Sequence, residues 1–205
     1  MDLMRLATDE RADLVALLED LDADEWNRPS LCEDWRVRDV AAHVISYDVL
    51  SPLATIGRFL QGGLSVSRIN AIGVRRARAL EPAQIIAQYH SRPRPTGLTA
   101  GLKGGIGLTD GVIHHQDIRR ALGRPREIPR ERLDAALPFS LKAPTLRGRK
   151  IAKGLTLAAT DLDWHHGEGP EVRGTGEALL MACAGRGIAV DELSGEGVEV
   201  LRSRL

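Results

Sequence analysis

Apolar residues recur at helical spacing along most of the chain, which predicts a mainly helical protein. Leucines repeat from residue 3 to residue 21 among acidic residues and arginines, and this pattern indicates an amphipathic first helix. Pro29 lies in the break that follows it. The same spacing predicts further helices over about residues 37–51, 65–79, 82–91, 106–122 and 175–184, with Pro52 either ending the second helix or starting another.

The pattern changes beyond about residue 154. Residues 155–160 are strand-like, residues 163–170 are rich in turn formers, and residues 197–201 indicate a closing strand. This boundary in composition predicts two domains, a helical bundle over residues 1–150 and a small α+β domain over residues 151–205. We therefore expect a mainly α fold with a small α+β segment at its C-terminal end.

The segment between the expected helices 82–91 and 106–122 has little capacity for regular structure. Residues 92–105 contain two prolines and four glycines, so we expect a mobile loop there. Its basic residues, Arg92, Arg94 and Lys103, could pair with an anionic group of a substrate, although a solvated loop is the simpler interpretation.

Composition narrows the class of protein. Aromatic residues make up only 3% of the chain, so the core is mostly aliphatic, which suits closely packed helices. The 28 basic and 28 acidic residues balance, so no overall field favours nucleic acid or an anionic membrane. The best basic cluster, Arg75, Arg76 and Arg78, is spread around a helix and indicates a solvated face.

Two further features concern location and redox state. No apolar run approaches the roughly 18 residues of a membrane span, and the N-terminal residues lack a signal pattern, so we expect a cytoplasmic protein without membrane contact. Cys32 and Cys183 are too few for a disulfide framework and lack the spacing of a zinc knuckle. Both are expected to be small buried hydrophobic residues.

The candidate chemistry lies in the helix expected over residues 106–122. Asp110 and His114 are four residues apart, so they share one helix face with about 6 Å between their Cβ atoms. They could bind one ion together or form a hydrogen-bonded surface pair. Asp117 extends the same polar stripe, and charged groups on a face that meets other helices need partners or a metal. His43 lies in an apolar stretch, either as a third ligand or as a core histidine bonded to a carbonyl.

The other histidines are expected to lie outside this site. His115 projects about 140° around the helix from Asp110 and so faces away from it. The adjacent pair His165 and His166 lies among polar residues in a turn-rich segment, and we expect it at the surface. His90 has no assigned role.

Three segments together resemble a known family. They are residues 29–44, with Trp35 and His43; residues 110–125, with an acidic residue, three spacers, His, two spacers and Asp; and residues 160–174. This arrangement is similar to that of the mycothiol-dependent maleylpyruvate isomerase family, a branch of the DinB-like bundles. The resemblance implies a DinB-like four-helix bundle that binds a divalent metal, most simply zinc.

The resemblance also implies a site and a reaction. His43, Asp110 and His114 would be the metal ligands, and Asp117 would support them from behind unless it pairs with an arginine such as Arg38. Three protein ligands leave a coordination position open. A metal-bound mycothiol thiolate would then attack a small electrophilic substrate, in an isomerase or an S-transferase.

Two departures from the family pattern keep other functions open. Asp110 stands where we expect Glu, so the carboxylate is one methylene shorter. Arg36 stands where relatives often carry a helix-starting Ser or Thr, and Asp34 could cap that helix instead. A metal-dependent hydrolase that uses metal-bound water is one alternative, and a non-catalytic binding or stress-response module with a lapsed site is another.

Overall fold

The computed structural model describes residues 1–63, 65–143 and 145–205. These residues form two compact units, Met1–Arg126 and Glu127–Leu205. The units divide after Arg126, earlier than the boundary at residue 150 that composition suggested, because helix α8 (Arg130–Lys142) packs against α10 (Gly176–Cys183) of the second unit. The assignment of residues 1–150 and 151–205 as domains stays a prediction.

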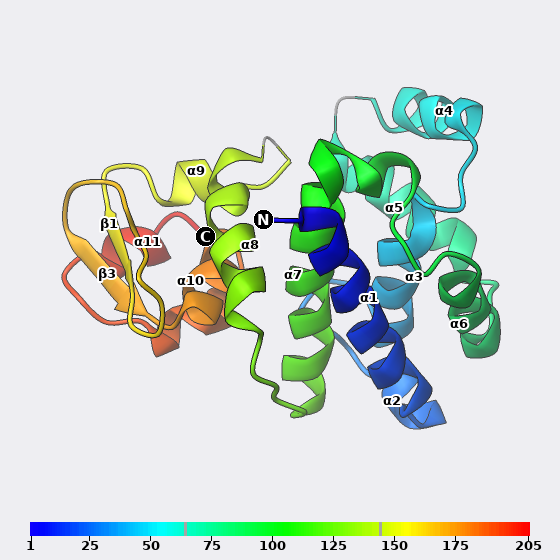
Figure 1. Cartoon of the computed structure of the whole chain (residues 1–205), viewed down its shortest axis with the longest axis horizontal. Helices are drawn as coiled ribbons and strands as arrows, with labels where there is room; N and C mark the ends of the chain where they lie inside the picture. Colours follow the sequence, from blue (N-terminus) through cyan, green and yellow to red (C-terminus); the bar gives the residue numbers. More distant parts are fainter. Residues whose placement is uncertain (64, 144) are drawn as a thin grey trace. The chain divides into compact units, whose positions relative to one another are not determined.

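The named elements in the described part of the first unit are all helices, joined by loops (Figure 1). It contains seven α-helices and two short 3-10 turns in the described residues. They are α1 (Leu3–Glu19), α2 (Ala23–Asn27), α3 (Val37–Ser46), α4 (Pro52–Gly62), α5 (Val66–Ala77), α6 (Pro82–Ser91), η1 (Gly97–Ala100), η2 (Leu102–Gly104) and α7 (Gly105–Leu122). The second expected helix therefore ends at Ser46, and a new one begins at Pro52.

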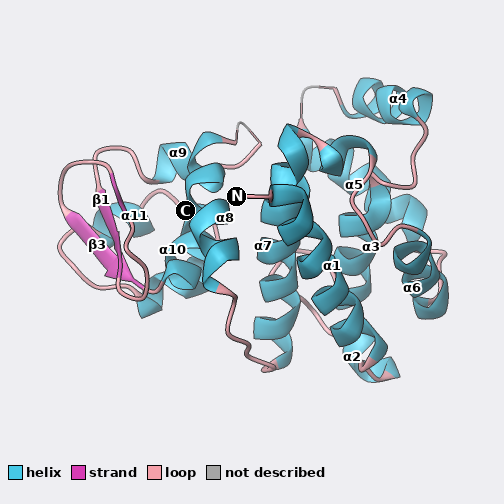
Figure 2. Ribbon diagram, viewed as in Figure 1, coloured by secondary structure: helices cyan, strands magenta, loops and turns pink. Residues whose placement is uncertain are grey.

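Four of these helices form a bundle. α1 packs against α7 and α6, and α3 packs against the same two helices, so the four close around one core. The core is aliphatic, with Leu14, Leu18, Val40, Ile45 and Ile118 almost fully buried. Figure 2 shows the mainly helical structure with a small sheet. The expected mainly α, four-helix-bundle fold is confirmed.

The start of α3 differs from expectation. Arg36, not Asp34, is the N-cap residue, and its side chain makes no cap hydrogen bond. The Arg36 backbone N–H instead donates, at 3.1 Å, to the Oδ2 atom of Asp39, which is the third residue of the helix. Asp34 lies in the left-handed region at φ 62° in the preceding turn, so it is too far back to cap the helix.

The segment 92–105 is more regular than expected. It contains η1 and η2, and a buried carboxylate holds it to the bundle. Asp48 forms a two-pronged ion pair with Arg11, both N···O distances being 3.1 Å. The same carboxylate accepts the Thr96 backbone N–H at 2.6 Å and the Thr99 hydroxyl at 2.9 Å. These bonds attach the loop to the bundle at Thr96 and Thr99.

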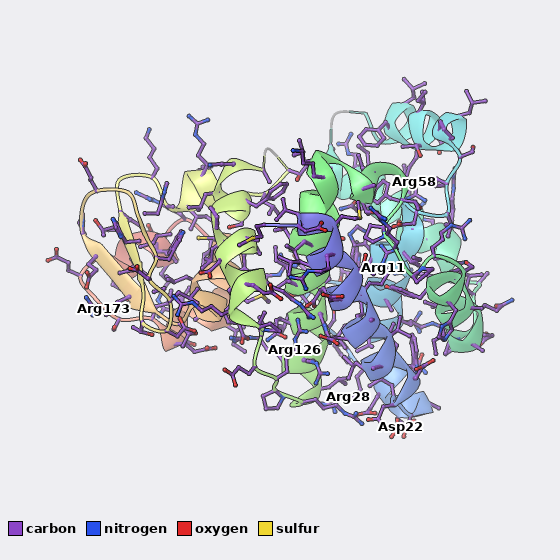
Figure 3. All side chains as sticks on the ribbon, viewed as in Figure 1. Arg11, Asp22, Arg28, Arg58, Arg126 and Arg173 are labelled. Carbon is purple, nitrogen blue, oxygen red and sulfur yellow. The ribbon has the colours of Figure 1, made fainter. Side chains whose placement is uncertain are left out.

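Helix α4 has the reverse of the usual amphipathic orientation. Leu53, Ile56 and Leu60 are 81%, 56% and 78% exposed. Arg58, the sole charged residue of the helix, is only 3% exposed. Figure 3 labels Arg58, which lies on the inner side of α4. Burial of apolar side chains therefore contributes little to the attachment of α4.

The second unit is a small α+β assembly. In its described residues it contains α8, α9 (Gly148–Ile151), β1 (Thr156–Ala159), β2 (His165–His166), β3 (Glu171–Gly174), α10, η3 (Gly187–Glu192) and α11 (Val198–Arg202). The strand order is β2-β1-β3, with β1 antiparallel to β2 and parallel to β3. Leu157 of β1 pairs with Val172 of β3, and both side chains are fully buried. The expected strand at 155–160 and helix at 175–184 are confirmed.

One expected strand is wrong. Residues 197–201 lie largely in helix α11. Val198 and Leu201, three residues apart, are buried, whereas Val200 is 39% exposed. The local alternation of Val198 and Val200 suggested a strand, but the helical spacing of Val198 and Leu201 decides the packing. His165 and His166 are exposed as expected, in β2.

Among the described residues, no helix is both long enough and apolar enough to span a membrane.

Candidate metal centre

The three candidate ligands come together inside the bundle. His43 projects from α3, and Asp110 and His114 project from successive turns of α7. Their nearest donor atoms all lie within 4.8 Å of one another. His43 is buried and the Asp110 side chain is 32% exposed. The centre is therefore enclosed on the α3 side and accessible on the Asp110 side.

The distances from Asp110 to the two imidazoles are close to those around a small divalent ion. Asp110 Oδ1 lies 3.7 Å from His43 Nε2 and 3.5 Å from His114 Nε2. Two donors at zinc distances on a tetrahedron lie about 3.3 to 3.6 Å apart. The shorter Asp110 side chain therefore reaches both imidazoles. Two imidazole nitrogens and one carboxylate also make a suitable donor set for zinc.

His43 lies in the uncharged form that a metal requires. Its ring is almost completely buried, and its Nδ1 has no hydrogen-bond partner among the described residues. Burial lowers the pKa of His43, although Asp110 acts in the opposite direction. A neutral imidazole at this position can donate a lone pair without first losing a proton.

Two side chains contact the Nδ1 side of the His114 ring. Its Nδ1 lies 2.9 Å from Asp117 Oδ2 and 3.6 Å from Cys32 Sγ, and the Cys32 thiol donates to Asp117 at 3.1 Å. Burial acts to lower the pKa of His114, but Asp110, Asp117 and Cys32 outweigh it and raise that pKa to about 10. The Asp117 carboxylate fixes a proton on Nδ1, so Nε2 is the nitrogen directed at Asp110.

The Arg38 guanidinium donates to the carbonyl of Leu80. The backbone carbonyl of Asp117 also accepts the N–H of Leu31, which holds the loop that carries Cys32. The geometry therefore favours the support of His114 over an arginine pair.

Aromatic rings surround the two imidazoles. The Trp35 ring lies 5.0 Å from the His43 ring and 6.4 Å from the His114 ring, centroid to centroid. Tyr47, one turn after His43 on α3, lies edge-on to His43 at 6.2 Å. These rings exclude water from one side of the centre. Tyr47 was not indicated by any motif or spacing, because its contact with His43 depends on the path of α3.

Cys32 is the clearest site residue missed by sequence reasoning. It was expected to be a buried hydrophobic residue, but it is half-buried beside His114 and Asp117. Cys183 does fit that expectation, since it is fully buried and burial raises its thiol pKa to about 12. The signal for Cys32 was its place in the segment 29–44, directly before Trp35.

His115 faces away from this centre and serves a different contact. Its Nδ1 lies 2.8 Å from Glu10 Oε1 of α1, and its Nε2 accepts from Arg119 at 2.9 Å. Arg126 also donates to Glu10. Burial lowers the pKa of His115 to about 4 despite Glu10. The neutral ring therefore donates to Glu10 and accepts from Arg119, and it links α1 to α7.

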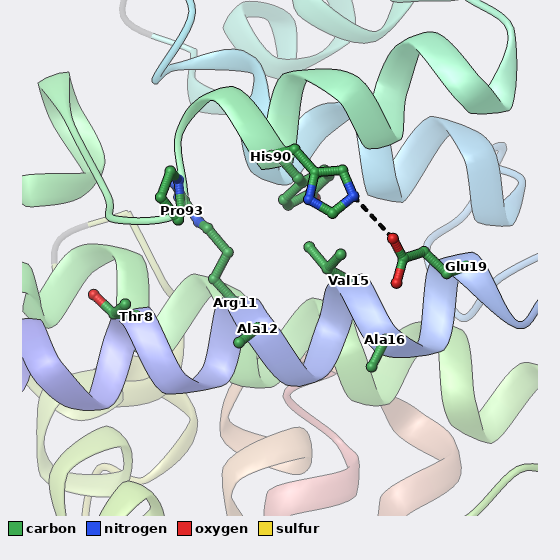
Figure 4. A pocket seen from close by; sticks show the side chains of 9 residues that line it. Thr8, Arg11, Ala12, Val15, Ala16, Glu19, His90 and Pro93 are labelled. Atoms are coloured by element: carbon green, nitrogen blue, oxygen red, sulfur yellow. Dashed lines mark hydrogen bonds and ion pairs between the residues drawn. The ribbon is translucent and has the colours of Figure 1, made fainter.

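A groove of about 270 Å³ lies between α1 and α6 in the described part of the chain (Figure 4). Its lining includes Ala12, Val15 and Tyr89. At one end His90 Nε2 lies 2.8 Å from Glu19 Oε1. None of the three candidate ligands lines this groove, and His90 is a surface residue paired with α1.

These features define a class of protein: a helical bundle with two histidines and a carboxylate converging between its helices. Comparison with known families identifies the group within it. Residues 7–94 match the sequence profile described as the mycothiol maleylpyruvate isomerase N-terminal domain. This match supports the expected family resemblance for the N-terminal part of the chain.

Solved structures show the same fold. The chain is similar to the crystal structure of a mycothiol-dependent maleylpyruvate isomerase, at 15% identity and a TM-score of 0.53. A histidine-to-alanine variant under the same description aligns at 16% identity and a TM-score of 0.56. Each match covers 95% of this chain and 90% of the other. No curated protein matches the chain.

Proposed function

We propose that this chain is a divalent-metal-binding, mycothiol-dependent isomerase or S-transferase that acts on a small electrophile. His43, Asp110 and His114 are its metal ligands, and zinc is its metal. The observation that carries the proposal is the convergence of these three side chains within 4.8 Å, in a chain whose N-terminal part matches the mycothiol maleylpyruvate isomerase family. A divalent metal at this centre would hold a thiol as its thiolate at neutral pH.

The surrounding residues suit this chemistry. Asp117 keeps a proton on His114 Nδ1 and leaves Nε2 for coordination. Trp35 covers both imidazoles and limits access by water. The partly exposed side of the centre at Asp110 gives a small molecule a way in. An isomerase and an S-transferase would use these residues in the same way, because none of these roles depends on whether the product keeps the thiol.

The two reactions share their first step. The thiolate sulfur adds to a carbon of a conjugated double bond, which becomes a single bond about which the substrate can rotate. In an isomerase the sulfur then leaves and the double bond forms again in the other geometry. In an S-transferase the enolate formed by the addition instead takes a proton from water at carbon, and the new carbon–sulfur bond is kept. We place this activity in the cytoplasm, because thiols there are kept reduced.

The test is metal analysis of the purified protein combined with mycothiol titration. We expect about one divalent ion per chain in the wild type, and loss of most of it in His43→Ala and His114→Ala. His166→Ala is the matched control, because His166 is exposed in β2 of the other unit. Mycothiol added to cobalt-substituted wild type should change the absorption spectrum, and maleylpyruvate should then be isomerised or consumed as a thiol adduct.

Three results would decide against parts of the proposal. Wild type without bound metal, or both histidine variants with full metal content, would exclude this ligand set. A bound metal that is indifferent to mycothiol would favour hydrolysis by metal-bound water. Metal and mycothiol binding without turnover would indicate a binding module.

A further inference from the structure

Arg58 is buried beside the candidate centre without a carboxylate partner. Its side chain is almost fully enclosed, and no acidic side chain of the described residues pairs with it. Its Nη1 donates to the Ser46 hydroxyl at 3.0 Å, and its guanidinium carbon lies 4.9 Å from the centre of the Tyr47 ring. Its Nε has no acceptor in the described part of the chain. A buried arginine is normally paired with a carboxylate, whereas this one has only the neutral side chains of Ser46 and Tyr47 as partners among the described residues.

The surrounding helices are built to hold the guanidinium in place. Ser46 and Tyr47 close the end of α3, and α5 presents Gly73 to it. A Cβ added to Gly73 would lie only 2.6 Å from Arg58 Nη1. Tyr47 also contacts His43, so a single aromatic ring separates the guanidinium from a candidate metal ligand. Burial is the main cause of the lowered pKa of His43, and the nearby charge of Arg58 lowers that pKa further.

Folding energetics do not explain this arrangement. α4 turns its one charge inward and leaves Leu53, Ile56 and Leu60 in solvent. The opposite orientation would bury apolar area and hydrate the arginine, and both changes favour folding. A sequence that contradicts its own pattern at one place commonly does so at a functional site. The inward arginine is therefore better explained by a ligand than by stability.

We propose that the Arg58 guanidinium binds a carboxylate of the small molecule that reacts at the adjacent centre. The guanidinium offers a planar fork that matches a carboxylate, and its unpaired Nε–H is one of the donors. The bound carboxylate would place the electrophilic carbons of the substrate toward His43 and Asp110. This assignment rests on the proposed function and adds the residue that selects an anionic substrate.

The test compares maleate, a small dicarboxylate, with its uncharged diamide by calorimetry, on both metal-free and zinc-loaded protein. We expect wild type to bind maleate and not the diamide. Arg58→Gln should bind maleate about 10- to 100-fold more weakly, as loss of hydrogen bonds to a charged group requires. Arg58→Lys should be weakened less, because it keeps the charge and loses the fork.

The matched control is Arg75→Gln. Arg75 is exposed on α5, so it is a neighbouring arginine outside the buried site. We expect its maleate affinity to equal that of wild type. Metal content is measured in every variant and should not change with Arg58. Circular dichroism checks that each variant folds.

A second measurement does not depend on variant stability. In ¹⁵N-labelled wild type, the Arg58 Nε–H resonance should shift on addition of maleate and stay fixed on addition of the diamide. Maleate affinity unchanged in Arg58→Gln, or an Nε–H signal indifferent to maleate, would overturn the assignment. Both readouts are also taken without metal. A wild type that binds no metal would overturn the proposed function, whereas the maleate measurements alone decide the role of Arg58.

Discussion

The side chains behind His114 leave only one of its ring nitrogens facing the candidate centre. The Oδ2 atom of Asp117 accepts a hydrogen bond from His114 Nδ1, and the Cys32 thiol donates to the same oxygen. Asp117 is fully buried, so its charge acts in a medium of low polarity. His114 therefore has its orientation set before any ion binds, and a bound ion would displace the proton from Nε2 while Asp117 retains the one on Nδ1.

At this scale we predict that Asp117→Asn weakens zinc affinity by about 10- to 100-fold, because an amide orients the imidazole and raises its basicity less than a carboxylate does. Competition with a chromophoric chelator measures the change. Cys32→Ser is the matched control, since a hydroxyl preserves the hydrogen bond to Asp117. Equal zinc affinity in Asp117→Asn and wild type would show that His114 needs no such support.

Individual site residues differ in how far sequence predicts them. Asp110 and His114 are four apart on one helix, so helical geometry alone brings them together. His43 needed the family resemblance, because its approach to α7 depends on packing between helices. Cys32 and Arg58 could not be predicted from spacing. Cys32 is placed by a loop, and Arg58 lies on the side of α4 that the hydrophobic pattern assigns to solvent.

The contact between α1 and α7 depends on a buried charged network as well as on aliphatic packing. Glu10 of α1 is 1% exposed and accepts from His115 of α7 and from Arg126. Burial acts to raise the pKa of Glu10, but His115 and Arg126 outweigh it and lower that pKa from 4.5 to about 2. The folded protein thus keeps Glu10 charged at a pH where the unfolded chain is protonated.

This difference sets the sign of an acid effect on the bundle. A carboxyl whose folded pKa is lowered stabilises the fold above its unfolded pKa, and the contribution is lost as pH falls through the folded value. We predict that Glu10→Gln lowers the free energy of unfolding at pH 7. Between pH 4.5 and 2 it should also remove a slope of up to about 1.4 kcal/mol per pH unit that wild type shows.

Urea unfolding at pH 7, 4.5 and 3 measures both effects. Glu19→Gln is the matched control, because Glu19 lies on the same helix with its side chain 49% exposed. It should leave the free energy of unfolding nearly unchanged at each pH. Parallel pH profiles for Glu10→Gln and wild type would contradict the prediction.

Helices with a clear apolar stripe were the predictable elements. The leucine repeat located α1, and the apolar positions around His43 located α3. Sequence analysis placed no helix over α8, where Pro138 interrupts the pattern. It gave α11 the wrong structure because that helix is only five residues long. In so short a segment, the apolar pattern of a strand and that of a helix differ at only one or two positions.

At the scale of the whole molecule, the candidate site belongs to one compact unit. The three ligands, Cys32, Asp117 and Arg58 all lie within Met1–Arg126. This unit has a core of its own, built by α1, α3, α6 and α7. The match to the family N-terminal domain profile lies in the same unit.

We predict that a fragment comprising residues 1–126 folds and binds one zinc ion with an affinity within about tenfold of the full chain, because every proposed ligand and the core that holds them are retained. Circular dichroism and chelator competition test this. The same fragment with His114→Ala is the control and should fold without retaining zinc. A fragment that is unfolded, or folded but unable to bind zinc while the full chain binds it, would contradict the prediction.

The orientation of α4 has a consequence for motion. Little apolar area holds this helix to the bundle, so opening it costs far less than unfolding the core, and its amides should exchange with solvent early. A carboxylate paired with Arg58 would add a strong polar contact to a helix that has few other attachments to the bundle. Substrate binding would then slow amide exchange across α4, and recognition of the substrate and closure of the helix would be one event.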